Sequence, residues 1–350
     1  MSDTAYLEYY RDKTILVTGG AGAIGSNLVR ALGTLAKRVL VLDDLSSSFR
    51  WNVPSFPNVM FVEGSILDDI KLKRVFFERP AVVFHMAAFF ANQNSVDHPE
   101  SDLAVNGQGT LKLLEYSTIQ GVERFVYGSS GSSIYGSAPL PVTEDFMSMH
   151  LTTPYQATKM LGEIYCNFFH HHYGLPTVNT RFFNSYGPGE VPGQYRNVIP
   201  NFVYWAMKGL PLPITGSGEE TRDFTFIDDT TDGLLRSGFI QAAVGESFNL
   251  AGGRETKIID LANAINKATG NTAGVKLVPS RTWDTKKRMW ASVEKARKLI
   301  GYEPSTTLEQ GLPFAVKWVQ ENMERIEATE PFGPGMSSAV REMTVHESKS

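Results

Sequence analysis

Residues 14–25 read TILVTGGAGAIG, an apolar run that passes directly into a cluster of glycines. This pattern predicts a strand, a tight turn and the start of a helix. The glycines satisfy two overlapping spacings, Gly20-x-Gly22-x-x-Gly25 and Gly19-x-x-Gly22-x-x-Gly25. Glycines so placed permit a tight turn, a close approach of the backbone to a pyrophosphate, and close packing of helix on strand. A phosphate would lie against the free N–H groups at the helix start, whereas a plain glycine turn without a ligand is the alternative.

A second apolar strand, at 38–42, ends in Asp43 and Asp44. They follow the glycine turn by about the 20 residues at which a carboxylate meets the adenosine ribose of a dinucleotide. Asp43 is the better candidate, because a carboxylate there accepts the 2′-hydroxyl and repels a 2′-phosphate, which favours NAD over NADP. Two alternatives stay open: Arg50 in the following loop can pair with a phosphate, and an acidic pair can be a solvated strand end.

Composition and charge narrow the class of protein. The 350 residues, 42% apolar and 20% charged, are typical of a soluble globular protein with one large or two modest domains. The 33 basic and 37 acidic residues leave a net charge of −4 without a long basic block, which argues against nucleic acid or membrane partners. Cys166 is the only cysteine, which excludes an intrachain disulfide. Because we find neither a signal-peptide pattern nor a run near the ~18 apolar residues of a membrane span, we expect a cytoplasmic protein.

Short apolar runs alternate with helical patterns along the first half of the chain, at 59–62, 81–84, 124–127 and 177–182. The alternation predicts an α/β fold, a Rossmann-type doubly wound parallel sheet covered by helices on both faces. We expect this NAD-binding domain to span 1–188, with a return segment at about 222–252. A smaller C-terminal α/β substrate domain is expected at 189–330. Residues 331–350 are polar and lack periodicity, so we expect a mobile tail.

The residues that follow each strand form the candidate site, because open α/β sheets bind ligands at the carboxyl ends of their strands. Ala87 and Ala88 follow the fourth strand and allow a cofactor to pass close, and Asn106 on the next helix can orient backbone or ligand there. The strand from 124 ends in a cluster of hydroxyls, GSSGSSIYG at 128–136. Serines at strand ends often only form turns, which is the alternative for each of them.

Tyr155 and Lys159 are four residues apart, so on a helix they share one face and the ammonium can lie near the phenol. A neighbouring cation, together with a positive nicotinamide ring, favours phenolate and makes the tyrosine a usable general base. Spacing alone is weak evidence, because Tyr9 with Lys13 and Tyr204 with Lys208 have it too. Tyr155 is the one that opens the helix after the serine-tipped strand.

As a set, these motifs resemble the extended short-chain dehydrogenase/reductases that modify nucleotide sugars, such as the UDP-glucose 4-epimerases. The match covers about 14–324 and includes RFFNSYGPG at 181–189 and TRDF at 221–224. The resemblance implies tightly bound NAD, with Tyr155 as the acid/base at a sugar hydroxyl and Lys159 on the nicotinamide ribose. The residues it implies around the cofactor are Gly19, Gly22, Ala23, Ile24, Gly25, Asp43, Asp44, Ser65, Ile66, Ala87, Ala88, Asn106, Tyr155 and Lys159.

The resemblance also implies a nucleotide-diphosphate sugar as substrate, most often a UDP-sugar, with Asn184 and Arg222 on the diphosphate. A guanidinium is the usual bidentate ligand of phosphate. The serine tip is one residue longer than the family pattern, so the catalytic hydroxyl is Ser130 counted from the strand, with Ser132 in reserve. Gly64-Ser65 stands where the family usually has an acid near the adenine, and Phe90 where galactose epimerases have a lysine.

The strand tip also bears on the reaction. Dehydratases of this family carry an Asp-Glu pair before the Tyr-Gly, and decarboxylases a Glu, where this chain has Ser132 and Ser133. Without an added acid, the simplest chemistry is C4 epimerisation of a UDP-hexose by hydride removal and return. A 4,6-dehydratase, a UDP-glucuronate decarboxylase or a reductase of the same family are the alternatives. A non-enzymatic NAD-binding module is the alternative of a different class, against which the intact Tyr155 and Lys159 argue.

The resemblance places Met289 beside the sugar C2 substituent, where it would narrow the pocket against an N-acetyl group. Lys287 and Arg288 could instead bind a uronate carboxylate. Arg281 and Arg288 either close on the nucleotide or form a solvated face. We expect no metal site, since the three histidines at 170–172 point in different directions on a helix, where they suit its C-terminus. We expect a homodimer through helices at 102–117 and 155–170.

Overall fold

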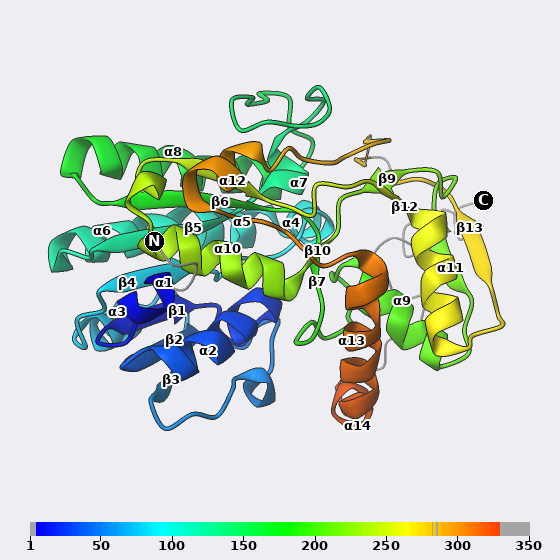
Figure 1. The fold of residues 1–350 in the computed structure, drawn as a ribbon, viewed down its shortest axis with the longest axis horizontal. Helices are drawn as coiled ribbons and strands as arrows, with labels where there is room; N and C mark the ends of the chain where they lie inside the picture. The colour runs from blue at the N-terminus through cyan, green and yellow to red at the C-terminus, as the bar shows by residue number, and fades with distance from the viewer. Residues whose placement is uncertain (1–4, 282, 285, 330–350) are drawn as a thin grey trace.

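The computed structural model describes residues 5–281, 283–284 and 286–329. Its centre is one seven-stranded sheet in the order β11-β6-β5-β4-β1-β2-β3, with every neighbouring pair parallel. The predicted Rossmann-type α/β fold is therefore confirmed (Figure 1). The strands are β1 (Thr14–Thr18), β2 (Arg38–Asp43), β3 (Val59–Glu63), β4 (Val82–His85), β5 (Arg124–Ser130), β6 (Thr177–Phe182) and β11 (Ser247–Leu250).

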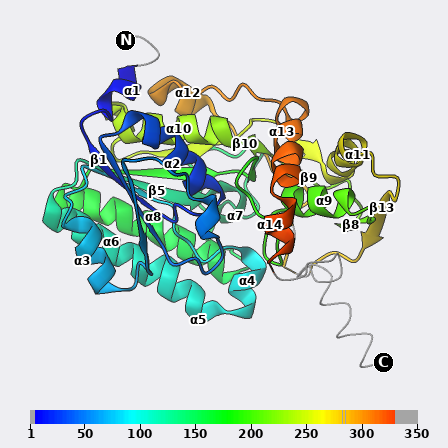
Figure 2. The same ribbon diagram turned by 90° about the horizontal axis from the view of Figure 1, so that it is seen from below.

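Helices cover both faces of this sheet (Figure 2). One face carries α1 (Ala5–Tyr9), α2 (Ala23–Leu35), α10 (Ile227–Phe239) and α12 (Glu294–Ile300). The other carries α3 (Asp69–Phe76), α6 (Thr110–Gln120) and α8 (Pro154–Tyr173). Both layers are needed because alternate strand residues point to opposite faces, and in β1 both sets are apolar: Ile15 and Val17 belong to one buried cluster, Leu16 to the other.

A second body lies beside the sheet, at the right of Figure 1, with a hydrophobic core of its own. It contains α9 (Val198–Met207), α11 (Ile258–Thr269), α13 (Leu308–Glu321) and α14 (Met323–Glu327). Its paired strands are β8 (Leu212–Thr215) with β13 (Val275–Val278) and β9 (Thr221–Arg222) with β12 (Thr256–Lys257). β7 (Ser185–Tyr186) pairs with β10 (Thr225–Phe226) where the two bodies meet.

The chain returns to the first body twice. The first return brings α10 and β11, whose Phe248 and Leu250 join the core on that face of the sheet. The second return was not anticipated from the sequence: Met289, Ala291 and the residues of α12 join the same core. The tail expected at 331–350 lies outside the described residues.

The remaining short helical segments lie in the connections between these elements. They are a 3-10 turn (Arg50–Asn52), α4 (Asn92–Asp97), α5 (Pro99–Asp102), a π-helical turn η2 (Leu103–Gly109), α7 (Gly131–Ile134) and a 3-10 turn (Gln241–Ala243). In the described part of the chain, no helix combines the length and apolar character needed to cross a bilayer.

Candidate active site

The glycine turn forms one wall of a cavity at the carboxyl ends of β1, β2, β4 and β5. Gly19 has φ of +69°, and a Cβ there would lie 2.5 Å from the backbone nitrogen of Ala87. A Cβ on Gly25 would lie 2.1 Å from the carbonyl oxygen of Gly19. Gly22, just before α2, has only that same oxygen nearby, at 3.3 Å from its Cβ position. Two of the glycines are thus required by packing, and the third keeps the helix start open to a phosphate.

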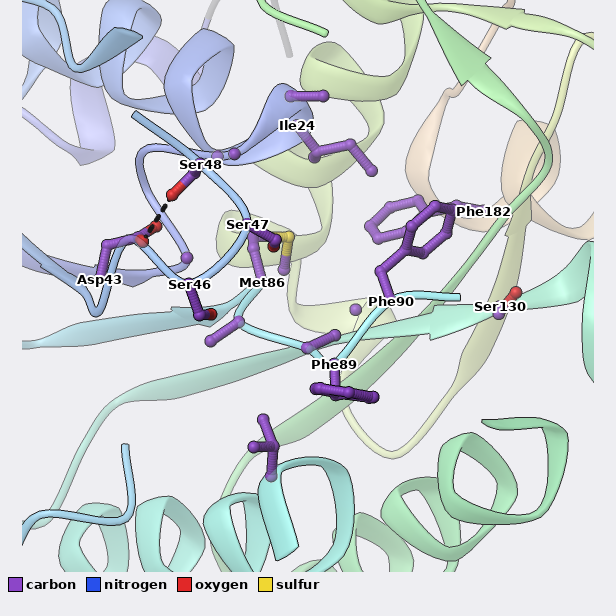
Figure 3. A pocket seen from close by; sticks show the side chains of 18 of the residues that line it. Ile24, Asp43, Ser46, Ser47, Ser48, Met86, Phe89, Phe90, Ser130 and Phe182 are labelled. Atoms are coloured by element: carbon purple, nitrogen blue, oxygen red, sulfur yellow. Dashed lines mark hydrogen bonds between the residues drawn. The ribbon is translucent and has the colours of Figure 1, made fainter. Parts of the chain in front are cut away.

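Asp43 closes one end of this cavity, and Ser130 lies toward the other, with Phe90 and Phe182 on its side (Figure 3). One Asp43 oxygen accepts hydrogen bonds from the Ser48 hydroxyl (2.8 Å) and the Leu45 backbone (2.9 Å). The other accepts from the Ala21 backbone (2.9 Å), so the carboxylate is fixed against the glycine turn. Arg50 instead stacks on the Phe61 ring at 4.4 Å and does not line the cavity. The alternative of a phosphate pairing with Arg50 therefore loses its support.

Most of the residues expected around a cofactor line this cavity. They are Gly19, Gly22, Ala23, Ile24, Gly25, Asp43, Asp44, Ile66, Ala87, Ala88, Tyr155 and Lys159. Ser65 does not: its hydroxyl turns away to accept a hydrogen bond from the Leu67 backbone (3.2 Å). Asn106 acts on the backbone, with Oδ1 accepting from Phe89 N (2.8 Å) and Nδ2 donating to Phe89 O (3.2 Å). It therefore shapes the wall that carries Ala87 and Ala88.

Tyr155 and Lys159 point into the same cavity from the first turns of α8, and both are buried. The Lys159 ammonium donates to the Gly128 carbonyl (2.9 Å) and lies 5.8 Å from the centre of the Tyr155 ring. Burial raises the pKa of Tyr155, and a hydrogen bond with Ser130 opposes that rise. The expectation that Lys159 lowers the tyrosine pKa is therefore not met within the protein alone. Burial also lowers the pKa of Lys159 to about 8, partly offset by the Asp102 carboxylate.

Asp102 and Thr158 support this pair and were not recognised in the sequence. The buried Asp102 carboxylate accepts hydrogen bonds from Asn106 (2.7 Å) and from the Thr158 hydroxyl (2.8 Å). It thereby joins η2, whose backbone departs from ordinary α-helix, to the catalytic helix α8. A π-helical turn is often found beside functional sites, but no sequence spacing marks it.

A second cavity adjoins the first and lies between the two bodies. The two cavities share Ser130, Ser132, Tyr155, Asn184 and Arg196. Asn184, at φ of +35°, donates to the Asp223 carbonyl (2.9 Å). Arg222 also lines this cavity, and its Nη2 donates to both oxygens of Asp284 (3.0 and 2.9 Å). A chain of cavities from Asp43 past the tyrosine to Arg222 is suited to a dinucleotide and a second phosphorylated ligand meeting at Tyr155.

Comparisons with known proteins identify the family. The model of the NAD dependent epimerase/dehydratase family matches residues 15–251. The chain belongs to this family. It is 34% identical to the UDP-glucose 4-epimerase of Mycolicibacterium smegmatis over 312 residues, 88% of this chain and 99% of the relative.

Two solved structures show the same fold. Epimerase Mth375 from Methanothermobacter thermautotrophicus is 54% identical, with a TM-score of 0.92 over 93% of this chain and 98% of that one. The Bordetella bronchiseptica enzyme WbmF, in complex with NAD+, is 34% identical, with a TM-score of 0.78 over 98% of this chain and 100% of that one.

The family uses NAD, and the first cavity of this epimerase/dehydratase fits that cofactor. Gly19, Gly22 and Gly25 would cradle the pyrophosphate and Asp43 would meet the ribose, with Tyr155 and Lys159 at the other end of the cavity. When bound, NAD+ accepts a hydride, and its positive ring favours the ionised form of a nearby phenol.

Glu190 and Arg196 also line the cofactor cavity of this family member, and no sequence motif singled them out. Glu190 is 4% exposed, and its Oε1 accepts from Asn197 (2.8 Å), while Oε2 is buried without a hydrogen bond in the structure. Burial raises the pKa of Glu190 to about 7, although Arg196 opposes the rise. Glu190 follows Gly189, whose Cβ position lies 2.8 Å from the Ser26 hydroxyl in α2, so it lines the same cavity as the glycine turn.

Several other residues lie away from both cavities. Met289, expected beside the sugar, is 2% exposed in the core of the first body and lines neither cavity, which corrects that prediction. Lys287 is exposed, and Arg288 pairs with Glu255 at the surface (2.5 Å), so neither lines the second cavity. Arg281 does line it. Among the described residues, no group of three or more His, Cys, Asp or Glu side chains could hold a metal ion.

Proposed function

We propose that this protein catalyses C4 epimerisation of a UDP-hexose. The observation that carries the proposal is that Ser130 and Tyr155 both line the two cavities where these meet, beside a strand tip that offers only serines. Asp284 and Glu220, the carboxylates lining the second cavity, are engaged: Asp284 by Arg222, Glu220 by the backbone of Ser217 and Gly218. Neither is placed at the serine tip, where a dehydratase or decarboxylase of this family has its acid.

In this proposal, Tyr155 removes and returns the proton of the sugar 4-hydroxyl. Ser130 shares that hydroxyl, and Lys159, held by the Gly128 carbonyl, keeps its ammonium near the phenol and the nicotinamide ribose. Buried in the protein, the tyrosine is neutral until a positive ring lies beside it, so proton removal depends on the oxidised cofactor. Because the hydride is returned to the same carbon, the reaction needs no external oxidant.

Asn184, Arg222 and Ser132 are proposed to bind the UDP-sugar. Asn184 and Arg222 would meet the diphosphate, for which Arg222 must share its guanidinium with Asp284. Asn184 and Arg222 can both donate hydrogen bonds to phosphate oxygens from the wall of the same cavity. This supports a nucleotide diphosphate as substrate better than a neutral metabolite. The dehydratase, decarboxylase and reductase remain alternatives within the family.

A substrate panel tests the reaction. The purified enzyme is incubated with UDP-glucose, UDP-galactose, their N-acetyl and uronate forms, and GDP- and dTDP-sugars, and the products are followed by NMR. We expect interconversion of one C4 epimer pair. Release of carbon dioxide, or accumulation of a 4-keto-6-deoxy sugar, would replace the epimerase with a decarboxylase or a dehydratase.

We also propose a homodimer through η2 and α8. The exposed apolar side chains there are Leu103 (55% exposed), Ile164 (50%) and Phe168 (48%). Leu113 and Leu114, within the segment 102–117 expected to form part of the interface, are fully buried in the protein's own core. The proposed interface therefore covers less of the surface than the segments 102–117 and 155–170 expected from the sequence, and it is centred on α8.

A further inference from the structure

Lys286 is a half-buried lysine that lines the second cavity and that no sequence motif indicated. It lies in the loop between β13 and α12, in the second body, and reaches back to the serine tip of the first. Its Nζ donates to the backbone carbonyls of Ser132 and Ser133, both at 2.9 Å. A lysine ammonium has three donors, so one is left for another group.

Its surroundings do not neutralise its charge. Among the described residues, no carboxylate lies within ion-pair distance of the Lys286 ammonium, and its two hydrogen-bond acceptors are uncharged. Asp284, the nearest acid in the loop, is held by Arg222. Burying a charge without a partner costs free energy, so such groups are normally paired. In a ligand cavity, the missing partner is most simply an anionic group of the ligand.

The place of the ammonium indicates which part of the ligand that is. Ser132 and Ser133 belong to α7, which follows directly on Ser130, and all three serines line the second cavity with Tyr155. Arg222 donates to the Lys286 carbonyl (3.0 Å), whereas the Lys286 ammonium reaches the carbonyls of the serine tip. The ammonium therefore lies next to Ser132 and Ser133, where the reacting sugar of the proposed function would lie.

We propose that Lys286 is a specificity-determining residue that binds a carboxylate on the sugar, so that the preferred substrate is an acidic nucleotide sugar. This rests on the proposed function and narrows it. The carboxylate is either the C6 carboxylate of a uronate or the carboxylate of an acid that is attached to the sugar ring through an ether bond. The residue is not the Lys287 or Arg288 that the sequence pointed to, because both face solvent.

Binding is measured by calorimetry on the NAD-loaded Tyr155→Phe variant, which binds without turnover. The three probes are UDP-glucose, UDP-glucuronate and UDP-N-acetylmuramate. We expect one of the acidic sugars to bind at least tenfold more tightly than UDP-glucose, and which one it is separates the C6 carboxylate from the ether. Adding Lys286→Met to this variant should abolish the preference for acidic sugars, while the affinity for UDP-glucose stays within about threefold of its value before the change. Adding Lys286→Arg instead should retain part of the preference, because the positive charge is kept.

Lys287→Met is the matched control, because it removes a neighbouring but exposed ammonium, and it should keep the preference. Loss of affinity for all three sugars alike in Lys286→Met would mean that the lysine only fastens α7, and would overturn the proposal. Equal binding of acidic and neutral sugars before any change at 286 would overturn it too, even if the methionine variant failed to fold. If the parent enzyme epimerises neutral hexoses and does not prefer acidic sugars, the role of Lys286 is refuted while the proposed function stands. If the parent enzyme epimerises no sugar at all, the proposed function itself is refuted.

Discussion

At the scale of single residues, burial sets the protonation of the groups around the cofactor. Tyr155 is held neutral, Lys159 has its pKa lowered to about 8, and Glu190 has its pKa raised to about 7. All three line the same cavity, so a ligand that brings charge into it changes each of them. Two predictions follow from this arrangement.

Tyr155→Phe removes the phenol and keeps the ring. We expect kcat for epimerisation to fall by about 10²–10⁴-fold, the usual contribution of a positioned general acid/base, while NAD binding is retained. Initial rates together with the NAD content of the purified variant measure both. A variant that keeps more than a tenth of the activity would exclude the tyrosine as the proton-transfer group.

Glu190 should make NAD binding depend on pH. Its pKa in the protein is raised, so it is neutral below about pH 7 and carries a negative charge above it. That charge would face the anionic pyrophosphate, so NAD affinity of the parent protein should fall as the pH rises through 7. Glu190→Gln keeps the shape and cannot ionise, and its affinity should change less between pH 6 and 8. Calorimetric titration at several pH values compares them, and parallel curves would contradict the prediction.

At the scale of elements, the second return of the chain decides which residues reach the site. Met289 and Ala291 follow the cavity-lining loop and enter the core under α12, whereas Lys286, only three residues earlier, lines the cavity. Within three residues, the side chains of this loop thus change from lining the cavity to packing in the hydrophobic core. Position along this loop therefore does not tell which of its side chains reach the substrate, because neighbouring side chains point in different directions.

Met289→Ala should act on stability and not on substrate choice. Truncating a buried methionine costs about 2–5 kcal/mol in the free energy of unfolding, because a cavity is left in the core. Arg288→Ala, at the surface beside it, should leave the free energy of unfolding nearly unchanged, because the pair with Glu255 is exposed to solvent. Urea unfolding measures both. A change in relative kcat/KM for N-acetyl and unacetylated sugars in Met289→Ala, without loss of stability, would return Met289 to the pocket.

At the scale of the whole molecule, the active site lies where two bodies with separate cores meet. The first supplies Ser130, Tyr155 and Lys159, and the second supplies Arg222 and Lys286. The far side of α8 then faces outward with Ile164 and Phe168 exposed. In the proposed enzyme and the proposed dimer, α8 would therefore carry Tyr155 and Lys159 on its inner face and the interface on its outer face.

We expect a dimeric mass by light scattering at micromolar concentration. Phe168→Glu places a charge in the proposed interface and should shift the mass to that of a monomer. Ile119→Glu is the matched control, because Ile119 is also exposed (77%) but lies at the end of α6, outside the proposed patch. A parent protein that is already monomeric contradicts the proposal, as does a dimer that both variants leave intact.

Features that depend on neighbours along the chain could be predicted from the sequence. Apolar runs alternating with helical patterns predict the parallel sheet, the glycine spacing predicts the turn before α2, and the four-residue spacing places Tyr155 and Lys159 on one helical face. Only the tertiary structure decided contacts between distant segments. Lys286 meets Ser132 across 154 positions, and Glu190 and Arg196 reach the cavity opposite Asp43 through a loop without periodicity. The burial of Met289 in the core of the first body could not be predicted from local spacing, because it depends on how the two bodies pack.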